Sequence, residues 1–221
     1  MKNSSQFLRM LLAASVSIIA FTACDKDESA PASTGNNNYS AQFNNLPKEA
    51  LSTIESTSLS FMREEEKLAR NVYKYLYEHW GANIFSNIGS SEQTHMDAVL
   101  LLLQKYALAD PAAGLGTGEF KNPDLQNLYW DLTAQGKKSI LDAYVVGATI
   151  EDLDLYDLYN ALEKVDNQDI IYVYENLAKG SRNHLRSFYR NILNAGGTYI
   201  PKFISQAEFD EIINSSMETG F

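Results

Sequence analysis

The chain has 221 residues, of which 45% are hydrophobic, and its formal net charge at pH 7 is −10. This length is sufficient for one domain with a full hydrophobic core. The acidic balance argues against nucleic acid as a partner and against electrostatic docking on anionic lipid. The single cysteine leaves no partner within the chain for a disulfide and no second thiolate for a cysteine-rich metal module.

Residues 1–23 are predicted to be a secretory signal rather than part of the fold. Two basic residues precede an apolar run over residues 10–21, which is too short to span a membrane as a mature helix. The run ends in Phe21–Cys24, which resembles a bacterial lipobox, so Cys24 is predicted to carry a lipid. The alternative is ordinary cleavage that leaves Cys24 as a free thiol.

Residues 24–47 are predicted to form a flexible polar tether, because this small and polar composition cannot bury itself. The tract Asp25–Glu28 is similar to the acidic tract after the lipid cysteine of surface-exposed lipoproteins in Bacteroidetes-type bacteria. A plain solvated tether would have the same charges. Loss of the two basic residues in 1–23 takes the net charge from −10 to −12. We therefore expect the lipid alone to hold the protein at the cell envelope, on the outer membrane or cell surface.

Residues 48–221 are predicted to form one domain that is almost wholly helical, so the fold class is all-α. The apolar periodicity predicts four long helices and a shorter helix that crosses between the two halves. A capping box at Ser205 and Glu208 opens a short C-terminal helix. The predicted ranges are about 58–79, 84–107, 123–135, 138–164, 168–194 and 205–215.

The step Glu92-x-x-His95 is the most informative motif, because an offset of three residues places both side chains on one helical face. Both lie in the middle of an otherwise apolar stripe that runs from Phe85 to Tyr106. A buried carboxylate is costly unless its charge is compensated, and a metal ion compensates it well. The alternative is a Glu–His hydrogen bond between packed helices, because the motif is short and common.

Three other predicted helices carry a metal-ligand type of residue in the middle of an apolar stripe, namely Glu66, Glu151 and His184. With Glu92 and His95 they make three carboxylates and two imidazoles that project into the core, as in a two-metal site between helices. Such a set suits iron or manganese better than structural zinc. We expect iron in a di-iron centre, with manganese or zinc as alternatives.

The spacing Glu66-x-x-Ala69-Arg70-x-x-Tyr73, followed by Glu92-x-x-His95, resembles the first helix pair of rubrerythrin-type ferritin-like proteins. Segments 64–70, 91–98 and 180–186 resemble still more closely an uncharacterised bacterial and archaeal ferritin-like domain family. The resemblance covers about residues 58–196. It implies a ferritin-like four-helix bundle with a crossing connection helix and a di-iron or related two-metal centre, but no substrate.

The fourth predicted helix departs from the rubrerythrin-type pattern, which has a second Glu-x-x-His step. Here the step reads Ser181-x-x-His184, so a serine stands where a carboxylate is expected. Asp154 lies three residues after Glu151 on the same helical face and is a candidate for the missing ligand. Glu175 is predicted to lie on the opposite side of the helix from His184. Without a replacement, the site would have an open position for water or dioxygen, or would hold a single metal ion.

Structural roles are expected for several charged residues near these motifs. Glu64 and Glu65 are predicted to be acids of the first helical turn, although Glu65 shares a stripe with apolar residues. Asp152 and Asp157 are expected to be solvated. His79 is expected to lie on the surface at a helix end.

Three tyrosines, Tyr73, Tyr144 and Tyr174, each lie seven residues from a proposed ligand position. They fall on the same apolar stripes as those positions, so core packing is the expected role. The alternative is hydrogen bonding to the metal ligands or electron relay.

The leading functional prediction is a lipid-anchored ferritin-like protein whose di-iron-type centre reacts with dioxygen or hydrogen peroxide. Glu92 or a neighbouring carboxylate would bridge the metals, while His95 and His184 would each bind one of them. The reaction class would be oxidase or peroxidase, used in oxidative-stress defence or iron handling. Because the chain has no cysteine-rich iron–sulfur module, an external electron donor is required.

Two other classes of function are compatible with the sequence. One is a metal-binding module without turnover, which scavenges or senses iron at the cell envelope. The other is a structural bundle whose buried polar residues form a hydrogen-bond network without metal. Whether the chain is an enzyme, and whether it forms a homodimer, stays open.

Overall fold

The computed structural model describes residues 43–219, and no strand occurs among them. The predicted signal at residues 1–23 and the predicted lipidation site Cys24 lie outside the described residues. No helix within the described range is long and apolar enough to cross a membrane. The all-α prediction is confirmed over this range.

Four long helices and two shorter ones account for most of the described residues, which begin with a further helical turn at 43–45. Their bounds are α2 (Thr53–Trp80), α3 (Asn83–Lys105), α4 (Pro123–Gly136), α5 (Ile140–Leu162), α6 (Gln168–Asn194) and α7 (Gln206–Asn214). The ranges predicted from the sequence agree closely with these bounds, except at the start of α2.

Helix α2 begins at Thr53 rather than near residue 58, because an N-terminal capping box extends it. The Ser52 hydroxyl accepts a hydrogen bond from the Glu55 N–H at 3.2 Å, and the Glu55 carboxylate accepts one from the Ser52 N–H at 2.8 Å. The earlier start places the charged run Arg63–Lys67 in the middle of the helix rather than in its first turn.

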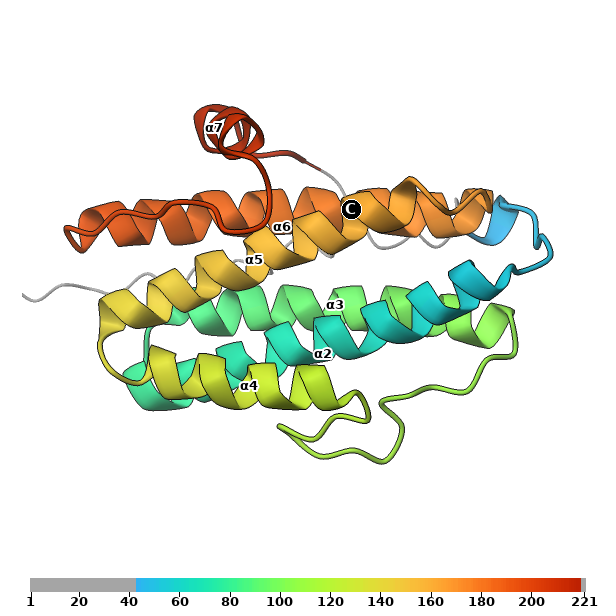
Figure 1. Ribbon diagram of the computed structural model, residues 1–221, viewed down its shortest axis with the longest axis horizontal. Helices are drawn as coiled ribbons and strands as arrows, with labels where there is room; N and C mark the ends of the chain where they lie inside the picture. The colour runs from blue at the N-terminus through green and yellow to red at the C-terminus, as the bar shows by residue number, and fades with distance from the viewer. Residues whose placement is uncertain (1–42, 220–221) are drawn as a thin grey trace, which may run out of the picture. The chain divides into compact units, whose positions relative to one another are not determined.

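The long helices pack as two pairs, α2 with α3 and α5 with α6, which form a helical bundle (Figure 1). Gly81 ends α2 in a left-handed conformation with a φ of 66°, so that α3 can return beside α2. The pairs contact each other through α2 with α5 and through α3 with α6. Helix α4 lies against α2 and α5, and α7 lies against α6. The core is enclosed between the two pairs.

Buried apolar residues lie on both sides of a polar middle along the long helices. On α2, Leu59 and Met62 precede Glu66, whereas Val72 and Leu76 follow it, and all five are buried. The apolar residues supply the burial that stabilises the bundle. The same burial leaves the polar residues at mid-height without contact with bulk water.

Charged residues of α2 hold the long connection between α3 and α4, residues 106–122. Arg63 forms an ion pair with Asp110 at 3.0 Å, and Lys67 Nζ donates to two loop carbonyls at 2.7 and 2.8 Å. Glu64 accepts hydrogen bonds from two N–H groups at the end of the loop, at 2.6 and 3.3 Å. The prediction that Glu64 is a first-turn acid was wrong, because it is a buried residue in the middle of a longer helix.

Asp152 is fully buried rather than solvated, so the prediction for this residue was wrong. Its Oδ2 accepts a hydrogen bond from the Tyr199 hydroxyl at 2.7 Å, and its Oδ1 accepts one from the Ile204 N–H at 2.9 Å. The segment that covers Asp152 follows α6, far along the chain from α5. Helical periodicity shows which face of a helix is apolar, but it cannot show that a distant segment of the chain packs over Asp152.

Candidate metal centre

Five of the residues proposed from the sequence meet in the middle of the bundle. Glu66, Glu92 and His95 form one group, and Glu92, Glu151 and His184 form a second. Within each group, the possible ligand atoms all lie within 4.8 Å of one another. Glu92 belongs to both groups, so the two sets of ligands share one carboxylate.

Four different helices supply these side chains. Glu92 and His95 lie one turn apart on α3, Glu66 comes from α2, Glu151 from α5 and His184 from α6. All five are buried, with exposures between 1% for Glu66 and 8% for His184. The α2–α3 pair by itself supplies the first group, whereas the second group depends on the packing of both pairs, because it joins Glu92 of α3 to Glu151 of α5 and His184 of α6.

Each imidazole faces two carboxylates through its Nδ1 atom. His95 Nδ1 lies 2.8 Å from Glu92 Oε2 and 3.2 Å from Glu66 Oε2. His184 Nδ1 lies 2.8 Å from Glu92 Oε1 and 3.3 Å from Glu151 Oε2. The two oxygens of Glu92 therefore serve different histidines, whose rings lie 5.5 Å apart between centroids.

The charges of these groups depend strongly on one another. Burial opposes the protonated forms of both imidazoles, but the carboxylates outweigh it and raise the pKa of His95 well above its usual value and that of His184 to about 10. Burial would raise the pKa of Glu92, yet His184 and His95 hold it below its usual range. Burial and the nearby Asp154 raise the pKa of Glu66. Without metal, protons on the imidazoles compensate the buried carboxylates.

The donor set also fits a cation. Imidazole nitrogens and carboxylate oxygens are ligands for iron, manganese and zinc. Glu66 Oε1 and Asp154 Oδ1 are buried without a hydrogen-bond partner, which is costly unless a cation or proton satisfies them. The close contact between Glu92 Oε1 and His184 Nδ1 lacks the direction of a good hydrogen bond. These atoms could hold a metal ion, but their arrangement does not identify it.

Asp154 lies beside the two groups without belonging to either of them. It is buried, and the Ser181 hydroxyl donates a hydrogen bond to its Oδ2. Burial and the charge of Glu151 raise the pKa of Asp154 to about 7. Ser181, which stands where the rubrerythrin-type pattern has a carboxylate, thus acts here as a partner for the carboxylate of α5.

Neighbouring side chains orient the proposed ligands. Tyr73 is fully buried, and its hydroxyl donates a hydrogen bond to Glu151 Oε1. His184 Nε2 lies 3.0 Å from Ser91 Oγ. If Nε2 carries the hydrogen, Nδ1 is left free to bind a metal. Tyr73 combines core packing with contact to a ligand, whereas sequence reasoning missed Ser91 entirely.

Gly180 makes room for one of the histidines. A Cβ atom at this position on α6 would lie 2.4 Å from His95 Nε2, closer than real contacts allow. A glycine inside a helix costs about 1 kcal/mol relative to alanine. A glycine in the interior of a predicted helix is the sequence signal that could have indicated the close approach of the His95 ring to α6.

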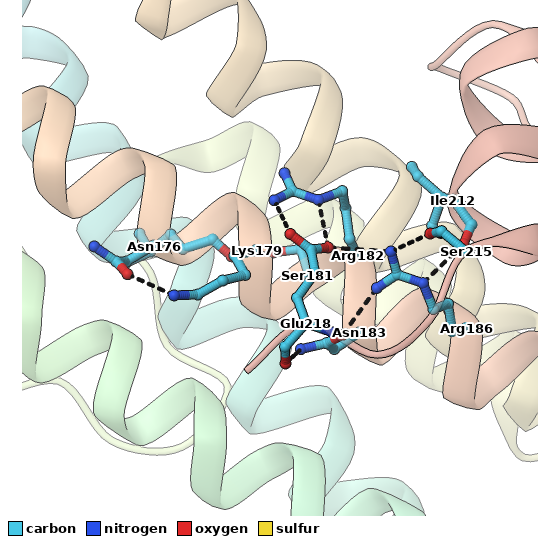
Figure 2. Close-up of polar contacts among 10 residues, drawn as sticks. Asn176, Lys179, Ser181, Arg182, Asn183, Arg186, Ile212, Ser215 and Glu218 are labelled. Carbon is cyan, nitrogen blue, oxygen red and sulfur yellow. Dashed lines mark hydrogen bonds and ion pairs between the residues drawn. The ribbon is translucent and has the colours of Figure 1, made fainter. Parts of the chain in front are cut away.

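The face of α6 that bears Arg182 and Arg186 is tied to the C-terminal segment (Figure 2). Both arginines bind the Glu218 carboxylate, with nitrogen–oxygen distances of 2.5 Å and 3.1 Å. Asn183 Nδ2 donates to the Glu218 carbonyl at 3.0 Å. These contacts hold in place the helix that carries His184. The local sequence of α6 does not predict them, because Glu218 lies far along the chain.

The family of this chain follows from its similarity to known proteins. Residues 55–216 match a family described as an uncharacterized protein domain, DUF2202. The chain belongs to this family. It is also 54% identical over 178 residues to the uncharacterized protein MJ0754 of Methanocaldococcus jannaschii, a match that covers 80% of this chain and 96% of that protein.

A solved structure supports the fold of this DUF2202 member. The structure of this chain is similar to the crystal structure of the hypothetical protein MJ0754 from Methanococcus jannaschii, with a TM-score of 0.77 and 54% identity. The match covers 78% of this chain and 99% of that one. These similarities place the helical domain in a family without assigning it a reaction, so the chemistry must be argued from the site.

Proposed function

We propose that this protein is a ferritin-like four-helix bundle whose buried centre binds two metal ions, iron first among the candidates. The observation that carries the proposal is that two ligand groups share Glu92. Each group also contains one histidine and one further carboxylate. A shared carboxylate is suited to bridge a pair of nearby metal ions. A single-metal site would leave one group without a role.

The roles of the side chains follow from their contacts. Glu92 would bridge the two ions, with His95 and Glu66 completing one site and His184 and Glu151 the other. Tyr73 would hold Glu151 in place through its hydroxyl. Asp154, held by Ser181 beside the centre, is a reserve carboxylate rather than a member of either group.

The proposed reaction class is oxidase or peroxidase, with dioxygen or hydrogen peroxide as oxidant. A bound pair of ferrous ions supplies two electrons, which is the number needed to reduce one hydrogen peroxide to two waters with two protons. The polypeptide positions this chemistry and excludes bulk water, since all five proposed ligands are buried. An electron donor outside the chain must then restore the reduced state.

Metal analysis tests this proposal directly. Protein purified without a histidine tag should hold close to two iron ions per chain after loading with ferrous iron under anaerobic conditions. Oxidant should then produce the near-ultraviolet absorption of an oxo-bridged pair. Glu175→Gln is a matched control, because Glu175 is exposed on α6 and its loss removes one negative charge outside the centre. Wild-type protein that binds no metal would refute the proposal.

A second candidate function is reversible metal binding without turnover, as in iron scavenging or sensing. It is favoured by the ion pairs of the centre, because protonated His95 and His184 can compensate the carboxylates when no metal is bound. A fold that is stable in both states suits release as well as capture. Iron that binds and dissociates, with no oxo-bridged absorption after oxidant, would favour this function over the enzyme.

The cellular place of the protein is also part of the proposal. The predicted lipidation of Cys24 would hold the domain at the cell envelope through the predicted tether over residues 24–47. The end of that segment belongs to the fold rather than to a flexible tether, because Phe43 is buried in the core and the Leu46 and Pro47 carbonyls accept hydrogen bonds from Lys105. The support for the lipid anchor is the signal-like N-terminal sequence, and the anchor stays a prediction.

A further inference from the structure

The seam between α2 and α5 carries acidic side chains outside the two ligand groups, and Glu65 is the most unusual of them. It was predicted to be a first-turn acid, but it lies in the middle of α2 and only 3% of it is exposed. Both of its carboxylate oxygens are buried without a hydrogen-bond donor. An ionised carboxylate in such a place is costly unless a proton or a cation joins it.

A second carboxyl group approaches Glu65 from α5. Asp157, which was expected to be solvated, is half-buried in the seam. The Asp157 carboxyl group lies within hydrogen-bonding reach of the Glu65 carboxyl group. Two carboxyl groups this close repel each other when both are ionised. The pair therefore holds either a shared proton or a cation.

The seam opens to solvent at a surface pocket of about 510 Å³. Ser58 and Met62 of α2 line it, together with Asp157 and Ala161 of α5. Lys164 also lines the pocket, where it is exposed and its charge interacts with that of Asp157. Asp157 belongs both to the pocket and to the carboxyl pair, so it connects solvent with the buried Glu65.

A row of acids on one face of α5 leads from this pocket toward the metal centre, with a rise of about 4.5 Å along the helix for each offset of three residues. Along α5 the acids Asp157, Asp154 and Glu151 follow one another at offsets of three residues, and Glu151 is a proposed ligand. On α2, Glu65 precedes the proposed ligand Glu66. Helices α2 and α5 are in contact with each other. Asp157 at the pocket, the buried Asp154 and the proposed ligand Glu151 therefore share one face of α5.

We propose that Glu65 and Asp157 form a loading site for divalent cations, through which metal enters the buried centre by way of Asp154. This inference rests on the proposed function, because a route needs a metal centre at its end. Oxygen ligands alone bind first-row divalent ions less tightly than sets that include imidazole. An ion held by Glu65 and Asp157 therefore moves on to the histidines rather than staying in the seam.

Cobalt loading measures the route separately from any reaction. Metal-free protein is mixed with Co²⁺, and the visible ligand-field absorption that develops at the imidazoles is followed by stopped flow. Glu65→Gln and Asp157→Asn should each slow loading by about tenfold, because they remove charge that concentrates the cation at the entrance. Both variants should reach the same final cobalt content per chain as the wild type.

Two further variants test whether the charge of the pair and the space in the pocket control the rate of loading. Glu163→Gln removes an exposed negative charge from the C-terminal end of the same helix, six residues from Asp157, and should load at the wild-type rate. Ala161→Leu narrows the pocket without changing any charge and should also slow loading. A wild-type rate in Glu65→Gln and Asp157→Asn, or in Ala161→Leu, would overturn the proposed entrance.

The final metal content separates the remaining outcomes. If Glu65→Gln lowers the cobalt content at equilibrium, Glu65 is a ligand of the centre itself and the loading site is refuted. If the wild type takes up no cobalt, the proposed metal centre fails and the route fails with it. If the wild type loads and every variant loads equally fast, only the route is wrong.

Discussion

At the scale of single residues, Glu92 is the side chain that connects the two ligand groups of the proposed centre. Its two oxygens face two different imidazoles at 2.8 Å each, and it is buried with 2% exposure. It compensates both histidines when they are protonated, and the same two oxygens can bridge metal ions when they are not. The chemistry and the stability of the middle of the bundle therefore depend on the same carboxylate.

Replacement of Glu92 by glutamine should affect both metal ions at once. Glu92→Gln keeps the shape but removes the charge, so we expect the affinity for both ions to fall by roughly a hundredfold or more. Isothermal titration with Co²⁺ measures the loss. Glu175→Gln, which removes an exposed charge, should leave both affinities unchanged. A variant that still fills one site with wild-type affinity would show that Glu92 does not bridge.

The pH dependence of the metal-free protein should reveal the charge on His184. Its carboxylate partners, Glu92 and Glu151, raise its pKa from 6.5 to about 10 in the folded protein. A raised pKa stabilises the fold fully below the unfolded value of 6.5, and this contribution is lost as the pH rises through about 10. His184→Asn should therefore destabilise the metal-free protein by about 3 kcal/mol at pH 6 and by much less above pH 10.

Urea unfolding of both metal-free proteins at several pH values checks this expectation. Metal binds the neutral imidazole, so loading at pH 7 should also release protons from the wild type. A destabilisation by His184→Asn that is equal at all pH values would mean that the imidazole is neutral in the folded protein.

At the scale of elements, α6 is the helix that must be placed most accurately. One side of it carries His184 and the small residues that admit the His95 ring. Another side is held by Glu218, whose carboxylate binds both Arg182 and Arg186. Helix propensity alone would favour alanine at position 180, but a side chain there would collide with the His95 ring.

Gly180→Ala should weaken metal binding even though alanine is the better helix former. The new Cβ atom would lie 2.4 Å from His95 Nε2, so the ring must shift from the position in which its Nδ1 contacts Glu66 and Glu92. We expect affinity at one of the two sites to fall by roughly tenfold or more, while the other site changes little. Stepwise Co²⁺ titration followed by visible absorption would distinguish the two sites.

Gly89→Ala provides the matched control for this substitution. Gly89 lies within α3, and a Cβ atom there would meet Tyr73 Cβ at 3.5 Å, which is an ordinary contact. This variant should bind metal normally and gain up to about 1 kcal/mol in stability from helix propensity. Equal effects of the two substitutions would argue that backbone flexibility, rather than the His95 contact, explains the result.

At the scale of the whole molecule, we expect the acidic helical domain and the N-terminal segment to have separate tasks. The domain from residue 48 onward contains the proposed centre, its supporting contacts and the proposed entrance. The lipid predicted at Cys24 would provide membrane attachment, since a domain with this net charge gains nothing from anionic lipid. The two tasks should therefore be separable by mutation.

Cys24→Ala should release the protein from the membrane fraction without altering the domain. Mass spectrometry of detergent-extracted wild-type protein should find a diacylated Cys24 at the start of the mature chain. Thermal unfolding and iron content of the variant should equal those of the wild type, because the tether separates the lipid from the fold. Wild-type protein that is soluble without detergent, or that retains a free Cys24 thiol, would contradict the lipid anchor.

The sequence alone predicted most of the helices and the candidate ligands, because both depend on the 3.6-residue period. An apolar stripe identifies the buried face of a helix, and a carboxylate or imidazole in that stripe is visible without any partner. Glu66, Glu92, His95, Glu151 and His184 were proposed in this way, and the structure brings them together. The start of α2 was misplaced because its capping box lies before the apolar stripe used to define the helix.

Only the tertiary structure decided which residues meet across the bundle. It pairs Ser181 with Asp154, covers Asp152 with the C-terminal segment, and buries Glu65 in the seam beside Asp157. Periodicity could not supply these contacts, because it describes one helix at a time and carries no information about what packs against its flanks. A carboxylate at the edge of an apolar stripe is solvated or buried according to a neighbour encoded elsewhere in the chain, and only the folded chain brings that neighbour to it.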